Sequence, residues 1–222
     1  MVTNRNNMNW QRARTDENKN ERKEAIYKAA YSLFKKNGYD KVSFNGIASE
    51  AGFTKSNMYR YFSSKEEIFL NVFAKLFEAW FEDYTSRLQD FEENQDIQIF
   101  AACWVDSFLA HPQLLDLTPL LFVSLEKNSS FEQLLEFKRL SRDLLFRVTL
   151  EVSRIYPEIH DEKAFRFLTL SYGATANFWS ANSQSDALVK LYAMEEFQEL
   201  KPNFKYDLTQ SIEVIIKGLK VP

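Results

Sequence analysis

Cysteine, histidine, glycine and proline are all scarce in this chain of 222 residues. Its single cysteine, Cys103, excludes an internal disulfide and is typical of a reducing compartment. Only two histidines occur, and neither a glycine-rich phosphate loop nor a metal-ligand spacing is present, so the common catalytic and metal-binding patterns are missing. We therefore expect no enzymatic activity, no cofactor and no metal site.

Long apolar runs are also missing. None approaches the roughly 20 residues that a helix needs to span a bilayer, and no charged-then-apolar signal segment opens the chain. A cytoplasmic protein without a membrane partner is expected.

The abundant residues favour helices. Leu, Phe, Ala, Glu and Lys dominate, and 45% of the residues are hydrophobic, which is ample for a core. Because few glycines and prolines interrupt these residues, strands are hard to place. The composition predicts an all-α fold.

Charge is distributed unevenly along the chain. Residues 1 to 65 contain 13 Lys and Arg against 6 Asp and Glu, a net +7, whereas residues 66 to 222 contain 15 against 25, a net −10. A basic N-terminal part on an acidic body indicates a polyanionic partner for the N-terminal part alone.

The basic part contains a helix-turn-helix pattern between residues 43 and 67. Ser43 is a good N-cap for a first helix, Gly52 supplies the left-handed residue that ends it, and Thr54 can cap the next helix. Two helices joined by a short glycine-containing turn make the pattern.

Rotation by about 100° per residue sorts the second helix, predicted from Lys55 to Phe62, into two faces. Lys55, Ser56, Tyr59 and Arg60 fall on one face, and Met58, Tyr61 and Phe62 fall on the inward one. The first set carries groups that contact phosphates and base edges in a major groove.

A third helix begins after this pattern. Ser63 or Ser64, with Glu66 or Glu67 three residues on, forms a capping box. Lys65 and the free backbone N–H groups at that start predict an anion site.

These residues resemble the DNA-binding domain of the tetracycline-repressor (TetR) family of bacterial transcription regulators. The matching positions cover about residues 20 to 70, and YRYFSSKEEI is their most specific run. They are Ala25 to Phe34, Gly38, Ile47, Ala48, Ala51, Gly52, Thr54, Lys55, Met58 to Phe62, Ser64, Lys65, Glu66 and Glu67.

The resemblance implies which residues contact double-stranded DNA. Lys55, Ser56 and Asn57, with Asn45 from the preceding helix, match base-reading positions, and Tyr59, Arg60 and Lys65 match phosphate-holding ones. Tyr61 matches a position that sometimes touches DNA, although its rotation favours the core. The complete predicted set is Asn45, Thr54, Lys55, Ser56, Asn57, Tyr59, Arg60, Tyr61 and Lys65.

Helical periodicity divides the chain into three parts: a flexible tail over residues 1–19, a DNA-binding three-helix bundle over 20–67 and a larger helical domain over 68–222. In the last part we expect helices over about 65–91, 97–111, 113–126, 130–156, 161–182 and 206–219. A partly helical insert is expected over 185–202.

The resemblance implies a homodimer built by the last two long helices, whose apolar stripes have the spacing of a shallow helix seam. The predicted interface residues are Phe165, Leu168, Tyr172, Ala176, Trp179, Leu208, Ile212, Ile215 and Leu219. Both stripes are also compatible with an intramolecular core.

The resemblance also implies that the acidic body binds a small-molecule effector of unknown identity. Its aromatic content suits an apolar or flat ligand, although aromatic residues at helical spacing are also ordinary core. The predicted effector residues are Trp104, Phe108, His111, Phe122, Arg139, Tyr172, Asn177 and Trp179.

The expected function is a repressor that binds a palindromic operator as a homodimer and is released by the effector. The alternative is a helical protein-interaction module without specific DNA binding. A basic N-terminal part favours the first.

Overall fold

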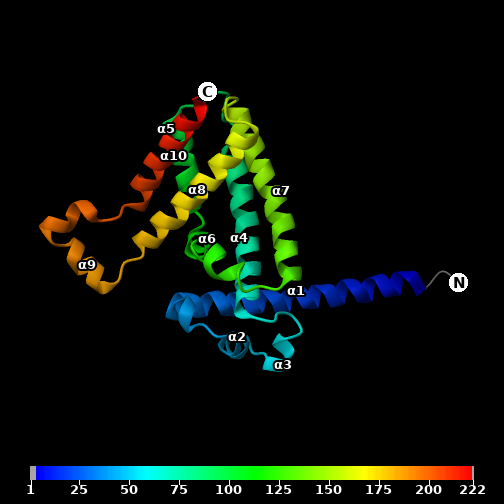
Figure 1. Ribbon diagram of the computed structural model, residues 1–222. Helices are drawn as coiled ribbons and strands as arrows, with labels where there is room; N and C mark the ends of the chain where they lie inside the picture. The colour runs from blue at the N-terminus through cyan, green and yellow to red at the C-terminus, as the bar shows by residue number, and fades with distance from the viewer. Residues whose placement is uncertain (1–3, 222) are drawn as a thin grey trace. The chain divides into compact units, whose positions relative to one another are not determined.

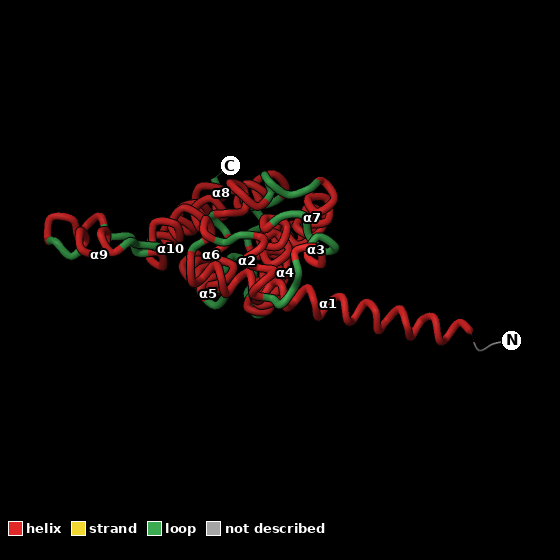
Figure 2. Tube along the Cα trace, turned by 90° about the horizontal axis from the view of Figure 1, so that it is seen from below, coloured by secondary structure: helices red, strands yellow, loops and turns green. Residues whose placement is uncertain are grey.

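The computed structural model describes residues 4–221 and consists of helices, with no strand within that range (Figures 1 and 2). The helices are α1 (Asn4–Asn37), α2 (Phe44–Glu50), α3 (Lys55–Met58), α4 (Lys65–Arg87), α5 (Ile97–Leu109), α6 (Pro112–Leu117), α7 (Phe131–Ile155), α8 (Asp161–Asn182), α9 (Asp186–Tyr192) and α10 (Phe204–Lys220). Two 3₁₀ turns, η1 (Tyr39–Lys41) and η3 (Glu195–Leu200), and a π-helical turn, η2 (Leu121–Leu125), complete the set. The all-α prediction is confirmed.

The chain folds into two compact units. The first contains the residues up to Val72 together with Ser124–Leu134, and the second contains Phe73–Val123 and the residues from Leu135 onward. This division differs from the boundary that we placed between residues 67 and 68, because a segment distant in sequence joins the first unit.

Hydrogen bonds hold residues 124–134 in the first unit. The Ser130 backbone N–H donates to Oε1 of Glu67 at 3.2 Å, and the Asn71 amide donates to Oε1 of Gln133 at 2.6 Å. A local sequence pattern cannot predict hydrogen bonds between residues about 60 positions apart.

The core of the first unit lies between α1, α2 and the start of α4. Ile26 and Ala30 of α1 and Ile47 of α2 are completely buried, together with Met58 and Ile68. α1 ends before Gly38, which has a φ of 78°.

Helix α1 begins earlier than the sequence indicated. Residues 4–19, which we expected to be a flexible tail, belong to α1, while residues 1–3 lie outside the described range. This stretch contains no glycine or proline, so nothing in it breaks a helix even though no apolar stripe marks one.

Two other predicted helices are shorter in the structure. α3 stops at Met58, and Arg60 and Tyr61 continue in tighter turns, bonded to the carbonyls three residues earlier. The helix predicted over 113–126 is divided into α6 and the π-helical turn η2. Within residues 4–221, no helix is both long and apolar enough to cross a bilayer.

The second unit surrounds an aromatic cluster. Trp80 stacks on Tyr84 with ring centroids 5.2 Å apart, and Trp104 meets both rings edge-on. α10 packs against α8 and α5, and the segment that contains α9 and η3 projects away from these helices (Figures 1 and 2).

Candidate nucleic-acid interface and effector site

The helix-turn-helix forms as its caps predict. The Ser43 hydroxyl accepts a hydrogen bond from the Gly46 N–H at 3.0 Å, and the Thr54 hydroxyl accepts one from the Asn57 N–H at 3.3 Å. Gly52 has a φ of 73°, a left-handed conformation in which a side chain is strained. Because its hydroxyl is used in this bond, the observed role of Thr54 is to cap α3.

One face of α3 and its following turn is exposed. Lys55, Ser56, Asn57 and Arg60 are solvent-exposed, and Tyr59 is 54% exposed. Asn45 of α2 is exposed as well. The structure thus places most of the predicted DNA contacts on solvent-facing positions.

The opposite face fixes this orientation. Met58 and Phe62 are buried, so α3 cannot rotate without exposing them. The Tyr59 ring lies 4.9 Å from that of Phe44, which holds the phenol against α2. Two exposed polar groups and two cations are consequently presented on a fixed surface.

Two predicted DNA contacts have other partners. Tyr61 is half-buried beside Phe53, and its hydroxyl lies 3.4 Å from Nη1 of Arg22, which donates to it. Lys65 is also half-buried: its ammonium donates to the carbonyls of Tyr39 at 3.1 Å and Val42 at 3.0 Å. Two of its three N–H donors therefore hold the turn before α2, which leaves one donor for the phosphate contact that we predicted.

The start of α4 forms the serine half of the predicted capping box, while the glutamate accepts from the residue before the cap. The Ser64 hydroxyl accepts from the Glu67 N–H at 3.2 Å, and the Glu67 carboxylate accepts from the Ser63 N–H at 2.7 Å and from the Ser130 N–H. Burial alone raises the pKa of Glu67, but the hydrogen bonds from Ser130 and Ser63 outweigh it and hold that pKa below its ordinary value. The protein's own carboxylate thus occupies part of the helix start that we expected to bind an external anion.

Sequence reasoning missed that Tyr39 connects the residues before α2 to Ser124. Its hydroxyl lies 3.0 Å from the Ser124 hydroxyl, and burial raises its pKa to about 12. The phenol therefore stays protonated at neutral pH. The two residues are 85 positions apart, so no local pattern could have paired them.

The predicted effector residues differ in exposure and surroundings. Trp104 and Phe108 lie in the aromatic core, whereas Phe122 is exposed and its ring lies 5.0 Å from that of Tyr172. Arg139 and Asn177 are exposed.

Three of these residues already have polar partners within the second unit. His111 Nε2 lies 3.3 Å from an Asp83 carboxylate oxygen, and the Tyr172 hydroxyl donates to the Thr118 carbonyl at 2.6 Å. The Trp179 indole N–H donates to Asp116 at 3.2 Å.

Four buried polar atoms in the second unit find no hydrogen-bond partner among residues 4–221. They are the hydroxyls of Tyr84, Ser141 and Ser171 and the indole N–H of Trp104. Burial, together with the nearby Cys103, raises the pKa of Tyr84 well above 10, so its phenol is neutral. An unsatisfied buried polar atom costs about 1–3 kcal/mol, which a ligand that pairs with it would recover.

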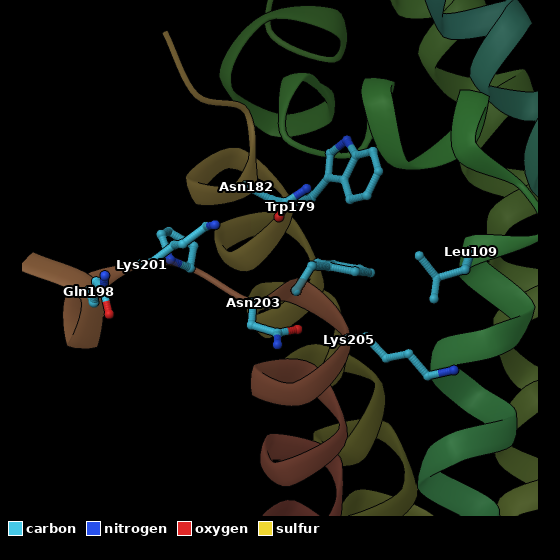
Figure 3. A pocket seen from close by; sticks show the side chains of 9 residues that line it. Leu109, Trp179, Asn182, Gln198, Lys201, Asn203 and Lys205 are labelled. Carbon is cyan, nitrogen blue, oxygen red and sulfur yellow. The ribbon is translucent and has the colours of Figure 1, made fainter. Parts of the chain in front are cut away.

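A pocket of about 420 Å³ opens where α8 ends and α10 begins (Figure 3). It is lined by Leu109, Trp179, Asn182, Gln198, Lys201, Pro202, Asn203, Phe204 and Lys205. Lys205 also forms an ion pair with Asp106 at 2.7 Å. Trp179 is the one predicted effector residue in this lining.

The predicted dimer residues divide into two groups. Leu208 and Ile212 are completely buried and Leu168 nearly so, which places them in the protomer's own core and corrects their assignment to an interface. The reason is that α10 packs against both α8 and α5. Tyr172, Ala176, Trp179, Ile215 and Leu219 are half-buried, and Phe165 is exposed.

The outer face of α8 and α10 carries little charge. α8 contains no charged residue from Phe167 to Asn182, and Phe165 and Leu170 are exposed on it. On α10 the exposed apolar residues are Tyr206 and Val214.

Within the described part of the chain, no group of three or more His, Cys, Asp or Glu residues has a geometry that would hold a metal ion.

Two family profiles match the chain. Residues 26–72 match the profile described as bacterial regulatory proteins of the tetR family, and residues 74–222 match the tetracyclin repressor-like C-terminal domain.

Two curated proteins of Bacillus subtilis (strain 168) are similar over part of their length. The uncharacterized HTH-type transcriptional regulator YfiR is 28% identical over 92 residues, 41% of this chain and 43% of YfiR. The uncharacterized HTH-type transcriptional regulator YerO is 42% identical over 53 residues, 24% of this chain and 18% of YerO. The matched region thus spans less than half the length of either relative.

Two solved structures share the fold. The fatty acid degradation regulator FadR from Bacillus halodurans has a TM-score of 0.51 and 16% identity, over 90% of this chain and 95% of that one. A transcriptional regulator of the TetR/AcrR family from Thermobifida fusca YX-ER1 has a TM-score of 0.53 and 19% identity, over 87% and 97%.

Proposed function

The chain belongs to the tetracycline-repressor (TetR) family of bacterial regulatory proteins, which regulate transcription by binding DNA, and from this premise we propose that it is a repressor acting as a homodimer on a palindromic operator. A small effector that is mainly apolar or aromatic releases it from the operator.

The exposed face of α3 is the observation that carries this proposal. Lys55, Ser56 and Asn57 are presented to solvent while Met58 beneath them is buried, which is the arrangement of a helix that reads a major groove. Tyr59 and Arg60 hold phosphates beside it. Lys65 acts through the turn that it fastens rather than as a principal phosphate ligand.

The outer face of α8 and α10, which carries few charges, supports pairing of two copies. Depletion of charge together with exposed aromatic and aliphatic residues is the composition of an interface core. Phe165 and Leu170 from α8 would meet Tyr206 and Val214 from α10 across a two-fold axis. A two-fold symmetric protein reads an inverted repeat, because each copy reads one half-site.

The aromatic core of the second unit is the proposed effector site. Its unpartnered groups, the Tyr84 hydroxyl and the Trp104 indole N–H, would pair with one or two polar atoms of a ligand whose remaining surface contacts Phe108 and Phe167. Such a ligand releases DNA only if it binds the DNA-free arrangement more tightly than the DNA-bound one.

The test of DNA recognition is a selection of bound duplexes from a random pool by the purified protein, at two salt concentrations. We expect a two-fold symmetric consensus whose affinity falls with salt. Weak binding that disappears with salt and yields no consensus would instead favour a helical interaction module.

The effector is then found by displacement. Aromatic compounds and free fatty acids would be screened for release of a fluorescent operator, with a variant Trp104→Phe as the specificity control. A compound that acts through the aromatic core should lose potency on this variant. Equal potency on both proteins would place its site elsewhere.

A further inference from the structure

The segment between α8 and α10 forms an arm, which we define as residues 183–203. It contains α9 and η3, and neither element has a buried residue. These two elements contact each other, and the arm projects from the ends of α8 and α10 in both views (Figures 1 and 2).

The arm carries apolar side chains that its own unit leaves uncovered. Val189, Met194 and Leu200 are between 50% and 67% exposed, and Leu188 and Leu191 are each 37% exposed. Helices of 7 and 6 residues are well below the roughly 12–15 residues at which an isolated helix becomes even marginally stable. An ordered arm of this kind therefore requires a surface that covers it.

Position and charge both favour a second copy as that surface. The arm leaves the α8–α10 face at the end of α8 and the start of α10, where the rings of Trp179 and Phe204 lie 4.9 Å apart. In a two-fold contact both copies use the same surface, so a segment that projects at the edge of this face would lie near the partner's equivalent face.

The exposed charges of the two surfaces are complementary. η3 presents Glu195, Glu196 and Glu199. From Arg166 to the end of α8, and along α10 to Lys217, the exposed charged residues are the cations Arg166, Lys205 and Lys217. Each forms one ion pair within its own protomer, with Glu162, Asp106 and Glu213 respectively, and its side chain still remains 59–62% exposed. Opposite charges on paired surfaces favour this contact over non-specific ones.

We propose that the arm of each protomer lies across the α8–α10 face of a second copy and clasps the dimer. This inference rests on the homodimer proposed above. The apolar side chains of α9 and η3 then become buried, and the acidic side of η3 lies beside the partner's Arg166, Lys205 and Lys217. Each dimer contains the contact twice.

The test uses the double variant Val189→Ser, Leu200→Ser. Both positions are exposed in the protomer, so the substitutions leave its core intact. We expect the dimer dissociation constant, measured by sedimentation equilibrium, to rise about tenfold or more, because four apolar side chains per dimer lose their burial. The matched control is Phe146→Ser, which removes an exposed apolar side chain from α7 and should change the constant less than about twofold.

Hydrogen exchange supplies a second readout on the unmodified protein. Amides of α9 and η3 should be protected above the dimer dissociation constant and exchange freely below it. Equal protection at all concentrations would show that the arm folds onto its own protomer, and an unchanged dissociation constant in the double variant would show that the arm does not contact the partner. Either result overturns the proposal.

Both measurements are made without DNA, so they separate the two proposals. Failure to select an operator would refute the DNA-binding function and leave the clasp intact. A dimer whose dissociation constant is unchanged in the double variant would refute the clasp alone, whereas a protein that is monomeric at every concentration would refute both the clasp and the proposed homodimer.

Discussion

The cations of the helix-turn-helix differ in the partners that the fold gives them. Arg60 is exposed, whereas the ammonium of Lys65 is half-buried and bonded to two carbonyls. A cation with free donors contributes to binding by releasing counterions from DNA, but one that fastens a turn contributes through stability. Sequence alone treats the two residues alike.

Substituting these two cations should therefore have different effects. Arg60→Gln should lower the magnitude of the salt slope of operator binding by about 1, with little change in stability. Lys65→Met should lower the free energy of unfolding by about 1–3 kcal/mol and leave the slope nearly unchanged. The measurements are operator titrations at several salt concentrations and urea denaturation. A slope lowered by Lys65→Met at unchanged stability would restore Lys65 as a phosphate ligand.

The buried phenol of Tyr84 provides a prediction in the second unit. Tyr84→Phe removes a hydroxyl that has no partner among the described residues and keeps the stacking on Trp80, so the free energy of unfolding should stay unchanged or rise by up to about 1 kcal/mol. The control is Tyr156→Phe, because the Tyr156 hydroxyl donates to the Gln95 carbonyl at 2.9 Å and its loss should cost about 1 kcal/mol. Equal losses in urea denaturation would show that the Tyr84 hydroxyl is paired.

At the scale of elements, the start of α4 depends on a buried carboxylate. Glu67 joins the backbone before α4 to residue 130 by accepting from the N–H groups of Ser63 and Ser130. Because these bonds favour the charged form, the pKa of Glu67 lies below its ordinary value of 4.5. A depressed pKa contributes stability that is present above the unfolded-state pKa and is lost as pH falls through the folded-state one.

Glu67→Gln should thus destabilise the protein most at neutral pH. The free energy of unfolding should fall by about 2 kcal/mol at pH 7, and the difference from the unmodified protein should shrink as the pH drops below about 4.5. Urea denaturation at pH 7, 5 and 3.5 measures this. Glu50→Gln, at an exposed position of α2, is the control and should show no such pH dependence. A constant difference across this range would rule out the charged carboxylate as the stabilising group.

At the scale of the whole molecule, pairing on the α8–α10 face decides whether the helix-turn-helix units of two copies bind one operator. Operator symmetry and the arm contact both follow from pairing on this face. The exposed apolar residues of this face can be substituted without changing the protomer's core.

Val214→Glu should break the dimer. Val214 is 67% exposed in the protomer, so glutamate is tolerated there, but dimerisation would remove two carboxylates, one from each copy, from water at an apolar contact, which costs desolvation energy. We expect the dimer dissociation constant to rise at least about 100-fold and operator affinity to fall with it. Phe146→Glu on α7 is the matched control. An unchanged constant in sedimentation experiments would move the interface to another face.

The sequence by itself determined the local structure. The hydroxyls of Ser43 and Thr54 each cap a helix by accepting a hydrogen bond from the backbone N–H three residues on. Gly52 ends a helix because glycine adopts a left-handed conformation without strain. These features follow from neighbouring residues alone. Helical periods also identified Met58 and Phe62 as buried and α3 as a surface helix. The family resemblance rested on this same local pattern, and the domain profiles confirm it.

Only the tertiary structure decided which of several equivalent partners each side chain meets. An apolar stripe has the same spacing whether its own chain or a second copy covers it. α10 packs against α8 and α5, and Leu208 and Ile212 are already completely buried within the protomer. Lys65 finds carbonyls 26 and 23 residues away, and Glu67 finds an N–H 63 residues away. Local periodicity cannot predict these partners, because it gives the face of the helix on which a side chain lies but not the residue that packs against that face.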